Sequence, residues 1–328
     1  MLHRTIAVSL APVAVLVAAA CSSSAPQCRV GADCASGACD SSGRCVAASS
    51  SSGGDSGSGG GDDSAVLEAG DDAAEASPGD DGGGGCKPNN DGVVTRAEVP
   101  MMAGLHASFV VAENVAVDSA GTKQPDGTRV WDLSGALQGD HTVIVTTDAP
   151  TGQWFSAQFT TATYTTKLSD TQTLLGVFQA QGQGLVLQGV VSPTSGAQQT
   201  EVSYAPAAQT LSLPMQIGAS WGNTAQISGT YYSTTCNCEL SVPYSEQYQS
   251  KVDARGTLKV PYGTFQVLRV QTTLTRTVGA LVTVTQSLAF IAECFGPVAS
   301  LTSQTTTNPN PPESTEFTNA AEARRLAP

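Results

Sequence analysis

Short apolar and β-branched runs, broken by glycine, proline, asparagine and aspartate, recur along residues 101–310. Clear examples are 142–147 (TVIVTT), 174–180 (LLGVFQA), 185–191 (LVLQGVV) and 260–274. Runs of this length between turn residues are typical of strands, and no segment carries a sustained helical stripe. The pattern predicts an all-β domain with an antiparallel sheet, folded either as a β-sandwich or as a half-open barrel.

Strict alternation indicates which side chains face the core. One phase of the run at 282–294 holds apolar residues and the other holds hydroxyl residues: Val282, Val284, Leu288, Phe290 and Cys294 against Thr283, Thr285 and Ser287. The preceding run alternates in the same way at Leu268, Val270 and Leu274. Successive side chains of a strand point to opposite faces, so we expect the apolar phases to face inward and the other face to be wet.

Residues 259–265 (KVPYGTF) predict a hairpin between two of these strands. Proline presets the backbone for the second position of a β-turn, and glycine suits the fourth. We therefore expect Pro261 and Gly263 to occupy those positions.

Residues 1–20 predict an export signal followed by an anchor. Arg4 supplies positive charge, the apolar run over 5–17 is too short to span a bilayer, and small residues at 18–20 precede Cys21. This ending resembles the lipobox of bacterial lipoproteins, in which the cysteine is lipidated and becomes the mature N-terminus. The resemblance implies a lipid anchor at Cys21, and Ser22 after it implies a cell-envelope location at the outer membrane of a Gram-negative bacterium.

The segment 49–85 separates a small cysteine-rich module at 21–48 from the β domain. It holds nine acidic residues, no lysine or arginine, and almost no large apolar side chain. Such a segment cannot bury enough surface to offset its chain entropy, so we expect a disordered linker. Residues 311–328 form a C-terminal tail that begins proline-rich, and its end is expected to add a last strand or a short helix.

The charge of the chain excludes some partners. The net charge is −13 for the whole chain, and residues 86–328 still carry 12 basic against 17 acidic groups. No basic patch is present, which argues against nucleic acid and against electrostatic attraction to anionic lipid. We therefore expect the chain to bind the membrane only through Cys21. The other expected partners are an apolar ligand or another protein.

Nine cysteines are present, and removing Cys21 leaves an even number in an exported chain. Disulfides are the expected state in that compartment. The module at 21–48 is predicted to hold two bonds whose pairing the sequence leaves open, among Cys28, Cys34, Cys39 and Cys45. A zinc site is the alternative for these four cysteines, although the usual close pairs are absent.

The other four cysteines are Cys86, Cys236, Cys238 and Cys294. Cys236 and Cys238 share one face of a strand with Leu240, Val242 and Tyr244, which predicts a core face. We expect one of Cys236 and Cys238 to pair with Cys294 and the other with Cys86. A metal or redox role for the C-x-C pair is the alternative.

Residues 87–98 (KPNNDGVVTRAE) resemble a calcium loop of the EF-hand or dockerin kind. The resemblance implies a weak calcium site, with ligands at Asn89, Asp91, Val93, Thr95 and Glu98. Lys87 stands where the family has aspartate. The same residues also predict a turn at 90–92, followed by a capping box from Thr95 to Glu98 that starts one helical turn before Pro100. Apart from calcium, no cofactor is expected.

Residues 218–222 (GASWG) match the G-x-S-x-G nucleophile motif. That motif needs a helix after the serine, and 223–230 is not helical in pattern. His106 and His141 are the histidines outside the signal, and a triad from Ser220, His141 and an aspartate is the enzymatic alternative. We instead expect a turn before a strand, with Trp221 packing on the core and no catalysis. Trp131 and Trp154 are expected in the core or around a cavity.

The V-P-x-G-x-F hairpin at 260–265 and the G-x-S-W segment at 218–221 resemble β-rich domains of bacterial envelope lipoproteins. Relatives of that type resemble half-barrel carriers with an apolar cavity. Two functions follow as expectations. The first is a non-catalytic structural or interaction protein, and the second is a carrier that binds a lipid or another apolar ligand. A filled core favours the first, and a large apolar cavity favours the second.

Overall fold

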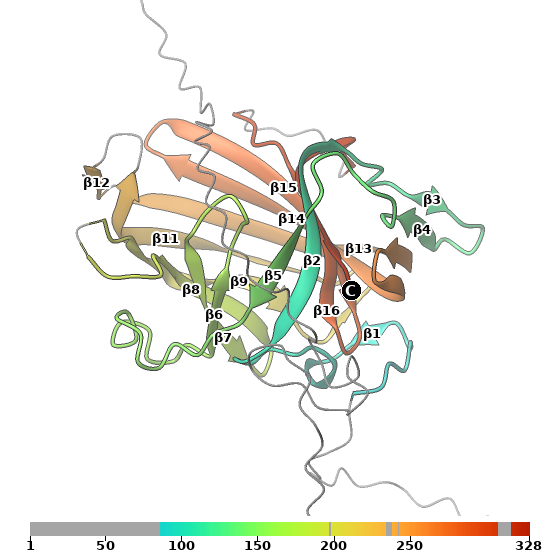
Figure 1. Ribbon diagram of the computed structural model, residues 1–328, viewed down its shortest axis with the longest axis horizontal. Coiled ribbons are helices and arrows are strands. Elements are labelled where there is room, and N and C mark those ends of the chain that lie inside the picture. The colour runs from blue at the N-terminus through green and yellow to red at the C-terminus, as the bar shows by residue number, and fades with distance from the viewer. Residues whose placement is uncertain (1–85, 197, 234–237, 242, 308–315) are drawn as a thin grey trace, which may run out of the picture. The chain divides into compact units, whose positions relative to one another are not determined.

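The computed structural model describes residues 86–196, 198–233, 238–241, 243–307 and 316–328. Within these ranges the fold is all-β apart from one 3₁₀ turn, η2 (Arg96–Glu98), which confirms the fold class expected from the sequence (Figure 1). The strands are β1 (Val93–Val94), β2 (His106–Ala116), β3 (Thr122–Lys123), β4 (Arg129–Asp132), β5 (His141–Thr146), β6 (Tyr164–Lys167), β7 (Leu175–Gln181), β8 (Gly184–Val191), β9 (Glu201–Ser212), β10 (Met215–Gln216), β11 (Ser220–Ser233), β12 (Cys238–Leu240), β13 (Tyr244–Val260), β14 (Gly263–Val278), β15 (Leu281–Ala292), β16 (Gly296–Ser303) and β17 (Asn319–Leu326).

One antiparallel sheet curls into a nearly closed, barrel-like wall. Its strand order is β5-β2-β17-β16-β15-β14-β13-β11-β9-β8-β7-β6. The two edge strands meet where Asp148, just after β5, pairs with Thr165 of β6 through two backbone hydrogen bonds of 2.8 Å. Of the two architectures left open by the sequence, the chain therefore adopts the barrel-like one, and the last strand β17 lies inside the sheet rather than beside it.

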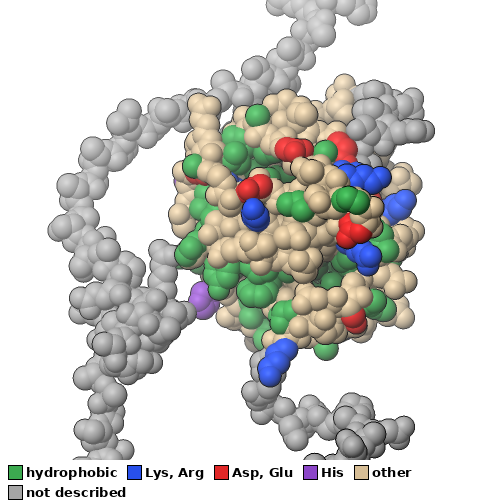
Figure 2. Space-filling view, turned by 90° about the vertical axis from the view of Figure 1, so that its right-hand side faces the viewer, with side chains coloured by type: hydrophobic (Ala, Val, Ile, Leu, Met, Phe, Trp, Pro, Cys, Tyr) green, Lys and Arg blue, Asp and Glu red, His purple; other side chains and the backbone are tan. Residues whose placement is uncertain are grey.

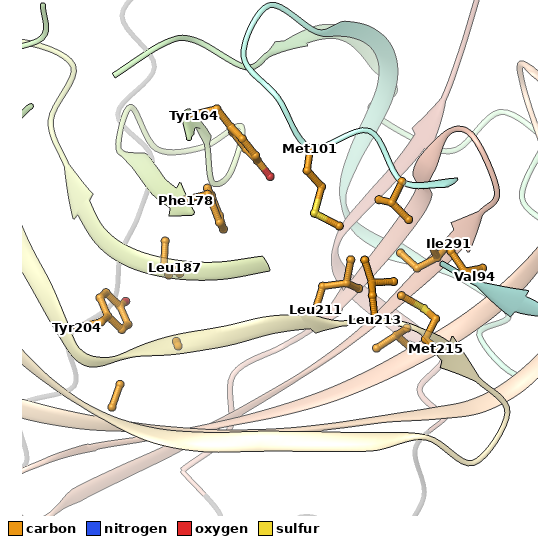
Figure 3. Close-up of a cluster of buried hydrophobic side chains, with 14 of the residues drawn as sticks. Val94, Met101, Tyr164, Phe178, Leu187, Tyr204, Leu211, Leu213, Met215 and Ile291 are labelled. Atoms are coloured by element: carbon orange, nitrogen blue, oxygen red, sulfur yellow. The ribbon is translucent and has the colours of Figure 1, made fainter. Parts of the chain in front are cut away.

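One end of the barrel interior is filled by apolar side chains. Residues 93–103, which we call the plug segment, carry β1 and η2 across this end, and β1 pairs with β10. Val94 and Met101 of the plug segment pack there with Leu213, Met215 and Ile291 from the sheet (Figure 3). We call this the closed end, and it belongs to the largest buried cluster in the described residues.

A β-bulge in β13 places a second core on the outer face of the sheet. Val252 pairs with Val270 and faces the interior core, whereas the register shifts before Ala254, which pairs with Arg269. Beyond the shift, Ala254 and Leu258 face outward into a cluster covered by Trp131 of β4. One extra residue therefore lets a single strand bury opposite faces in its two halves.

The apolar side chains expected to be buried in residues 282–294 include three that are buried, but they do not all face the barrel interior as expected. Val284, Leu288 and Phe290 are buried, but Leu288 and Phe290 belong to the outer core and not to the barrel interior. The interior face of β15 instead carries Thr283, Thr285, Ser287, Ala289 and Ile291, because these residues pair with the interior positions of β14. Both faces of the sheet are buried at this point, contrary to the expectation of one wet face.

The predicted hairpin and capping box are confirmed. β13 ends at Val260 and pairs with Gly263 across a two-residue turn of Pro261 and Tyr262. At η2 the Thr95 hydroxyl and backbone N–H both donate to Glu98 Oε2 at 2.8 Å. The 3₁₀ turn then ends before Pro100, as the sequence indicates.

Candidate functional site

A cavity of about 420 Å³ opens at the end of the barrel opposite the plug segment. Every residue that lines it lies at or beside the same end of its strand, from β6 round to β14, and we call this hollow the mouth cavity. Its apolar wall comes from the residues Leu168, Leu174, Val190, Val202, Tyr204, Tyr231, Tyr244 and Val278. Its polar lining groups are Gln172 and Arg276.

The alternation of the strands places these side chains inside. Tyr204 of β9 pairs with Ile227 of β11, which in turn pairs with Tyr244 of β13, so the three share the interior face. Val202 pairs with Val190 in the same phase. Burial raises the pKa of Tyr204 far above its ordinary value, so its hydroxyl stays neutral across the physiological range.

An ion pair between a buried carboxylate and a partly exposed arginine lies at the mouth cavity. Glu246 of β13 is fully buried, and its Oε1 accepts a hydrogen bond from Arg276 Nε at 2.8 Å and forms an ion pair with Arg276 Nη2 at 2.7 Å. Glu246 Oε2 accepts from the Tyr248 hydroxyl at 2.5 Å. The Arg276 guanidinium lies 5.4 Å from the centroid of the Tyr244 ring. Burial alone would lower the pKa of Arg276, but the Glu246 carboxylate raises it, so the arginine is charged.

The opposite wall of the interior is polar at this end. Thr283 and Thr285 of β15 pair with Arg276 and Leu274 of β14. Farther round the sheet, Ser287 pairs with Thr302, and Thr302 pairs with Glu322 of β17. The mouth end therefore has an apolar, tyrosine-bearing wall on one side and a hydroxyl-rich wall on the other.

The loop 168–174 forms one side of the mouth cavity through Leu168, Gln172 and Leu174. We call it the latch loop, because side chains fasten it across the seam between β5 and β6. Glu322 Oε2 of β17 accepts hydrogen bonds from the Ser169 hydroxyl and, at 3.4 Å, from the Asp170 backbone N–H. His141 Nε2 of β5 lies 2.6 Å from Asp170 Oδ2.

The two partners of His141 favour its imidazolium form. Its Nδ1 lies 3.1 Å from the Gly139 carbonyl oxygen, and its Nε2 faces the Asp170 carboxylate. Both partners only accept, and only a doubly protonated ring donates from both nitrogens. The hydrogen bond to Asp170 raises the pKa of His141, and the same bond lowers the pKa of Asp170.

The residues proposed as calcium ligands hold one another and the backbone. Asn89 Nδ2 donates to Glu98 Oε1 at 3.1 Å, and Asp91 Oδ1 accepts the Val93 N–H at 2.7 Å. The loop is fastened to the end of β15, where Glu293 Oε2 accepts the backbone N–H groups of Asn89 and Asn90. In the described chain, no three histidine, cysteine, aspartate or glutamate side chains gather as a metal site requires, and calcium binding stays a prediction.

We expected Cys86 and Cys294 to pair with the two cysteines of the C-x-C segment, and this prediction is wrong. Cys86 pairs with Cys294, which joins the start of the described chain to the β15–β16 turn across 208 residues. Sequence alternation could not find this pair because Cys294 lies beyond β15, in a turn with positive φ. Cys238 in β12 is also disulfide-bonded. Cys21, Cys28, Cys34, Cys39, Cys45 and Cys236 lie outside the described residues.

The G-x-S-x-G segment forms a turn followed by a strand. Ser220 is exposed and begins the 14-residue strand β11, while Trp221 packs against the interior core. Trp131 is fully buried and Trp154 packs on the third apolar cluster around Phe155, so neither lines the mouth cavity.

Comparisons with protein-family models, with curated proteins and with solved structures find no match to this chain. Among the described residues, no helix has the length and apolar character needed to cross a membrane. The residues of the mouth cavity therefore carry the functional argument by themselves.

The sequence analysis placed Tyr244 on a core face but did not single out Glu246, Arg276, Tyr204 or Tyr231. Tyr244, Glu246 and Tyr248 occupy every second position of β13 and so share one face with Ser250 and Val252. Arg276 likewise shares one face of β14 with Leu274 and Val278. A charged residue in the apolar phase of a strand is the signal that identifies such a pair, because a buried charge needs a partner.

Proposed function

We propose that this chain is a lipid-anchored, non-catalytic envelope protein whose β domain binds a small, largely apolar ligand in the mouth cavity. The observation that carries the binding role is the hollow of about 420 Å³ lined by three tyrosines and five aliphatic side chains, with Gln172 and Arg276 as its polar lining groups. Ligand sites are concave and mostly apolar with a few placed polar groups, and their volumes start at roughly 300 Å³. The filled closed end limits the ligand to the mouth.

Binding is tested with N-phenyl-1-naphthylamine, an uncharged probe that fluoresces in apolar sites. The purified full chain should give a saturable signal. Leu174→Trp, which fills the cavity from the latch loop, should weaken the affinity by about tenfold or more if the probe loses most of its apolar contact area. Ile217→Trp is the matched control, because Ile217 is 47% exposed just after β10, away from the mouth, and does not line the cavity. Absence of saturable binding, or equal binding by both variants, contradicts the proposal.

The anchor is tested separately at Cys21. The signal-like residues 1–20 and the cysteine that follows support lipidation in a bacterial host. We expect metabolic incorporation of a labelled fatty acid into the wild-type chain and none into Cys21→Ser, with the variant released from the membrane fraction. Equal labelling of both chains contradicts an anchor at this residue.

An interaction role is the second candidate, favoured by aromatic side chains exposed at the closed end. Tyr262 and Phe295 are 52% and 44% exposed, and both pack against Phe265. Figure 2 looks onto this end and shows apolar side chains among polar and charged ones. A photo-crosslinking residue at position 295 should join the chain to one defined partner in the intact envelope, and the same residue at position 281 should not. Identical adducts at both positions would exclude a specific surface here.

A further inference from the structure

We propose that the ligand of the mouth cavity is a small amphipathic anion, whose carboxylate, sulfonate or phosphate head binds the Arg276 guanidinium while its apolar part lies on the tyrosine-bearing wall. This inference rests on the proposed function and names the chemical class that the same cavity takes. It follows from how Arg276 is held, from what its donors face, and from where the apolar surface begins.

Arg276 is fixed in place on two sides. Its Nε donates to the buried Glu246 carboxylate, its Nη2 lies 2.7 Å from the same oxygen, and its guanidinium rests near the face of Tyr244. Within the described residues no hydrogen bond uses Nη1, and the side chain is 48% exposed where it lines the cavity. A guanidinium whose rotamers are already restricted loses little entropy when its remaining N–H groups take up a ligand oxygen.

The buried Glu246 carboxylate positions Arg276 and does not itself contact the proposed ligand. Glu246 is fully buried, and its two oxygens are occupied by Arg276 and by the Tyr248 hydroxyl. The pair is neutral overall, so an anion is bound by directed hydrogen bonds more than by net charge. A glutamine at position 246 keeps an oxygen that can accept from Arg276 Nε, but it removes the negative charge that offsets the guanidinium. Glu246→Gln should therefore strengthen anion binding, whereas removing Arg276 should weaken it.

The apolar part of the ligand has one wall to lie on. Tyr204, Tyr231 and Val202 line the cavity beside Arg276, and Val278 stands one alternate position farther along β14. A ligand with its head at Arg276 thus places its apolar part against side chains that lose water on binding. The volume of about 420 Å³ suits one short alkyl chain or two fused rings rather than a diacyl lipid.

The test uses two competitors with the same alkyl chain and different heads. Dodecanoate and dodecanol are titrated against the full chain loaded with N-phenyl-1-naphthylamine, at neutral pH. Wild type should release the probe at lower concentrations of dodecanoate than of dodecanol. Dodecyl phosphate and dodecyl sulfate in parallel titrations rank the three head groups.

Opposite changes in two single variants form the decisive result. Arg276→Gln should weaken dodecanoate by about tenfold and change dodecanol by less than about twofold, because only the charged head loses a charge-assisted hydrogen bond. Glu246→Gln should strengthen dodecanoate severalfold. Glu246→Gln/Arg276→Gln should resemble Arg276→Gln, and it answers the question if the single arginine variant leaves Glu246 unpaired and fails to fold. Lys251→Gln, which removes an exposed cation of β13 that does not line the cavity, should change neither competitor.

Two outcomes overturn the inference while the proposed function stands. One is a probe that binds wild type and is displaced equally by dodecanoate and dodecanol. The other is a Glu246→Gln variant that binds dodecanoate more weakly than wild type. A probe that does not bind wild type at all overturns the proposed function itself, so the two failures are distinguishable.

Discussion

The two ends of the barrel interior are built for different purposes from the same strands. At the closed end, the plug segment packs Val94 and Met101 against a fully buried Met215, and a disulfide joins Cys86 to the turn beside it. At the mouth end, the tyrosine-bearing wall leaves a hollow, and the buried Glu246 carboxylate pairs there with the partly exposed Arg276. We therefore expect the closed end to supply stability, whereas the mouth end is less tightly packed and holds the proposed ligand site.

Truncating the plug contact should have the largest effect on stability. Met215 is fully buried in the interior core, so Met215→Ala should lower the free energy of unfolding by about 2–5 kcal/mol through lost burial and a residual cavity. Leu281→Ala, at the exposed first residue of β15, should change it by less than about 0.5 kcal/mol. Urea denaturation measures both. Equal losses would show that the closed end is not the stabilising end.

Removing the disulfide should have the next largest effect. Cys86→Ser with Cys294→Ser opens a loop that spans 208 residues, and native disulfides contribute about 2–4 kcal/mol, mainly by restricting the unfolded chain. We expect the thermal midpoint to fall while the affinity for N-phenyl-1-naphthylamine at 25 °C is retained. A variant that melts like wild type but loses the probe would reverse the roles assigned to the two ends.

Truncating a side chain at the rim of the mouth should change ligand affinity more than stability. Tyr231 is 43% exposed and lines the cavity, so Tyr231→Ser should lower the free energy of unfolding by less than about 1 kcal/mol. The same variant should weaken probe binding severalfold, because it removes a ring from the apolar wall. Fluorescence titration and urea denaturation on one preparation test the comparison directly.

The latch loop should give the smallest effect, and one that depends on pH. The pKa of His141 is raised in the folded chain, so its stabilising contribution is complete below the ordinary value of about 6.5 and is lost as pH rises through the raised value. The pKa of Asp170 is lowered, so its contribution is complete above about 3.9 and is lost as pH falls through the lowered value. The latch is therefore strongest between these two ordinary values, with Glu113 adding to the attraction on His141.

This window is measured as the difference in melting temperature between wild type and His141→Gln. The difference should be largest near pH 5 to 6, because this range lies between the ordinary pKa values of about 3.9 for aspartate and about 6.5 for histidine. It should vanish in alkaline solution, where His141 is neutral. Asp170→Asn should lose the same pH-dependent part and should also lower the melting temperature in alkaline solution, because Asp170 pairs with Lys167 as well as with His141. A difference that does not change with pH would mean that the contact acts by packing alone.

The sequence predicted the class of the fold and several local features, and physical reasons explain where it stopped. Turn chemistry is local, so the hairpin at Pro261 and the capping box at Thr95 were found. Alternation indicates which side chains of a strand are buried, but it does not indicate which part of the protein they pack against. Leu288 and Val270 belong to paired strands and are both buried, yet they face different cores because other segments cover each side of the sheet.

The candidate site was predictable in part. Tyr244, Glu246 and Arg276 stand in apolar phases of their strands, so a search for charges in such phases would have found the ion pair. The hollow above it depends on the latch loop, which is fastened by Asp170 to His141 and Glu322. These contacts join residues 29 and 152 positions apart, and no short-range pattern encodes them.

The position of β17 constrains the order in which the chain assembles. This strand holds residues 319–326, and it is inserted between β2, which is made first among the long strands, and β16. β2 consequently has no neighbour on that side until β17 has been made, and non-local pairings of this kind form slowly. The wall can therefore be completed only after β17 is synthesised, and it cannot form step by step as the earlier strands emerge.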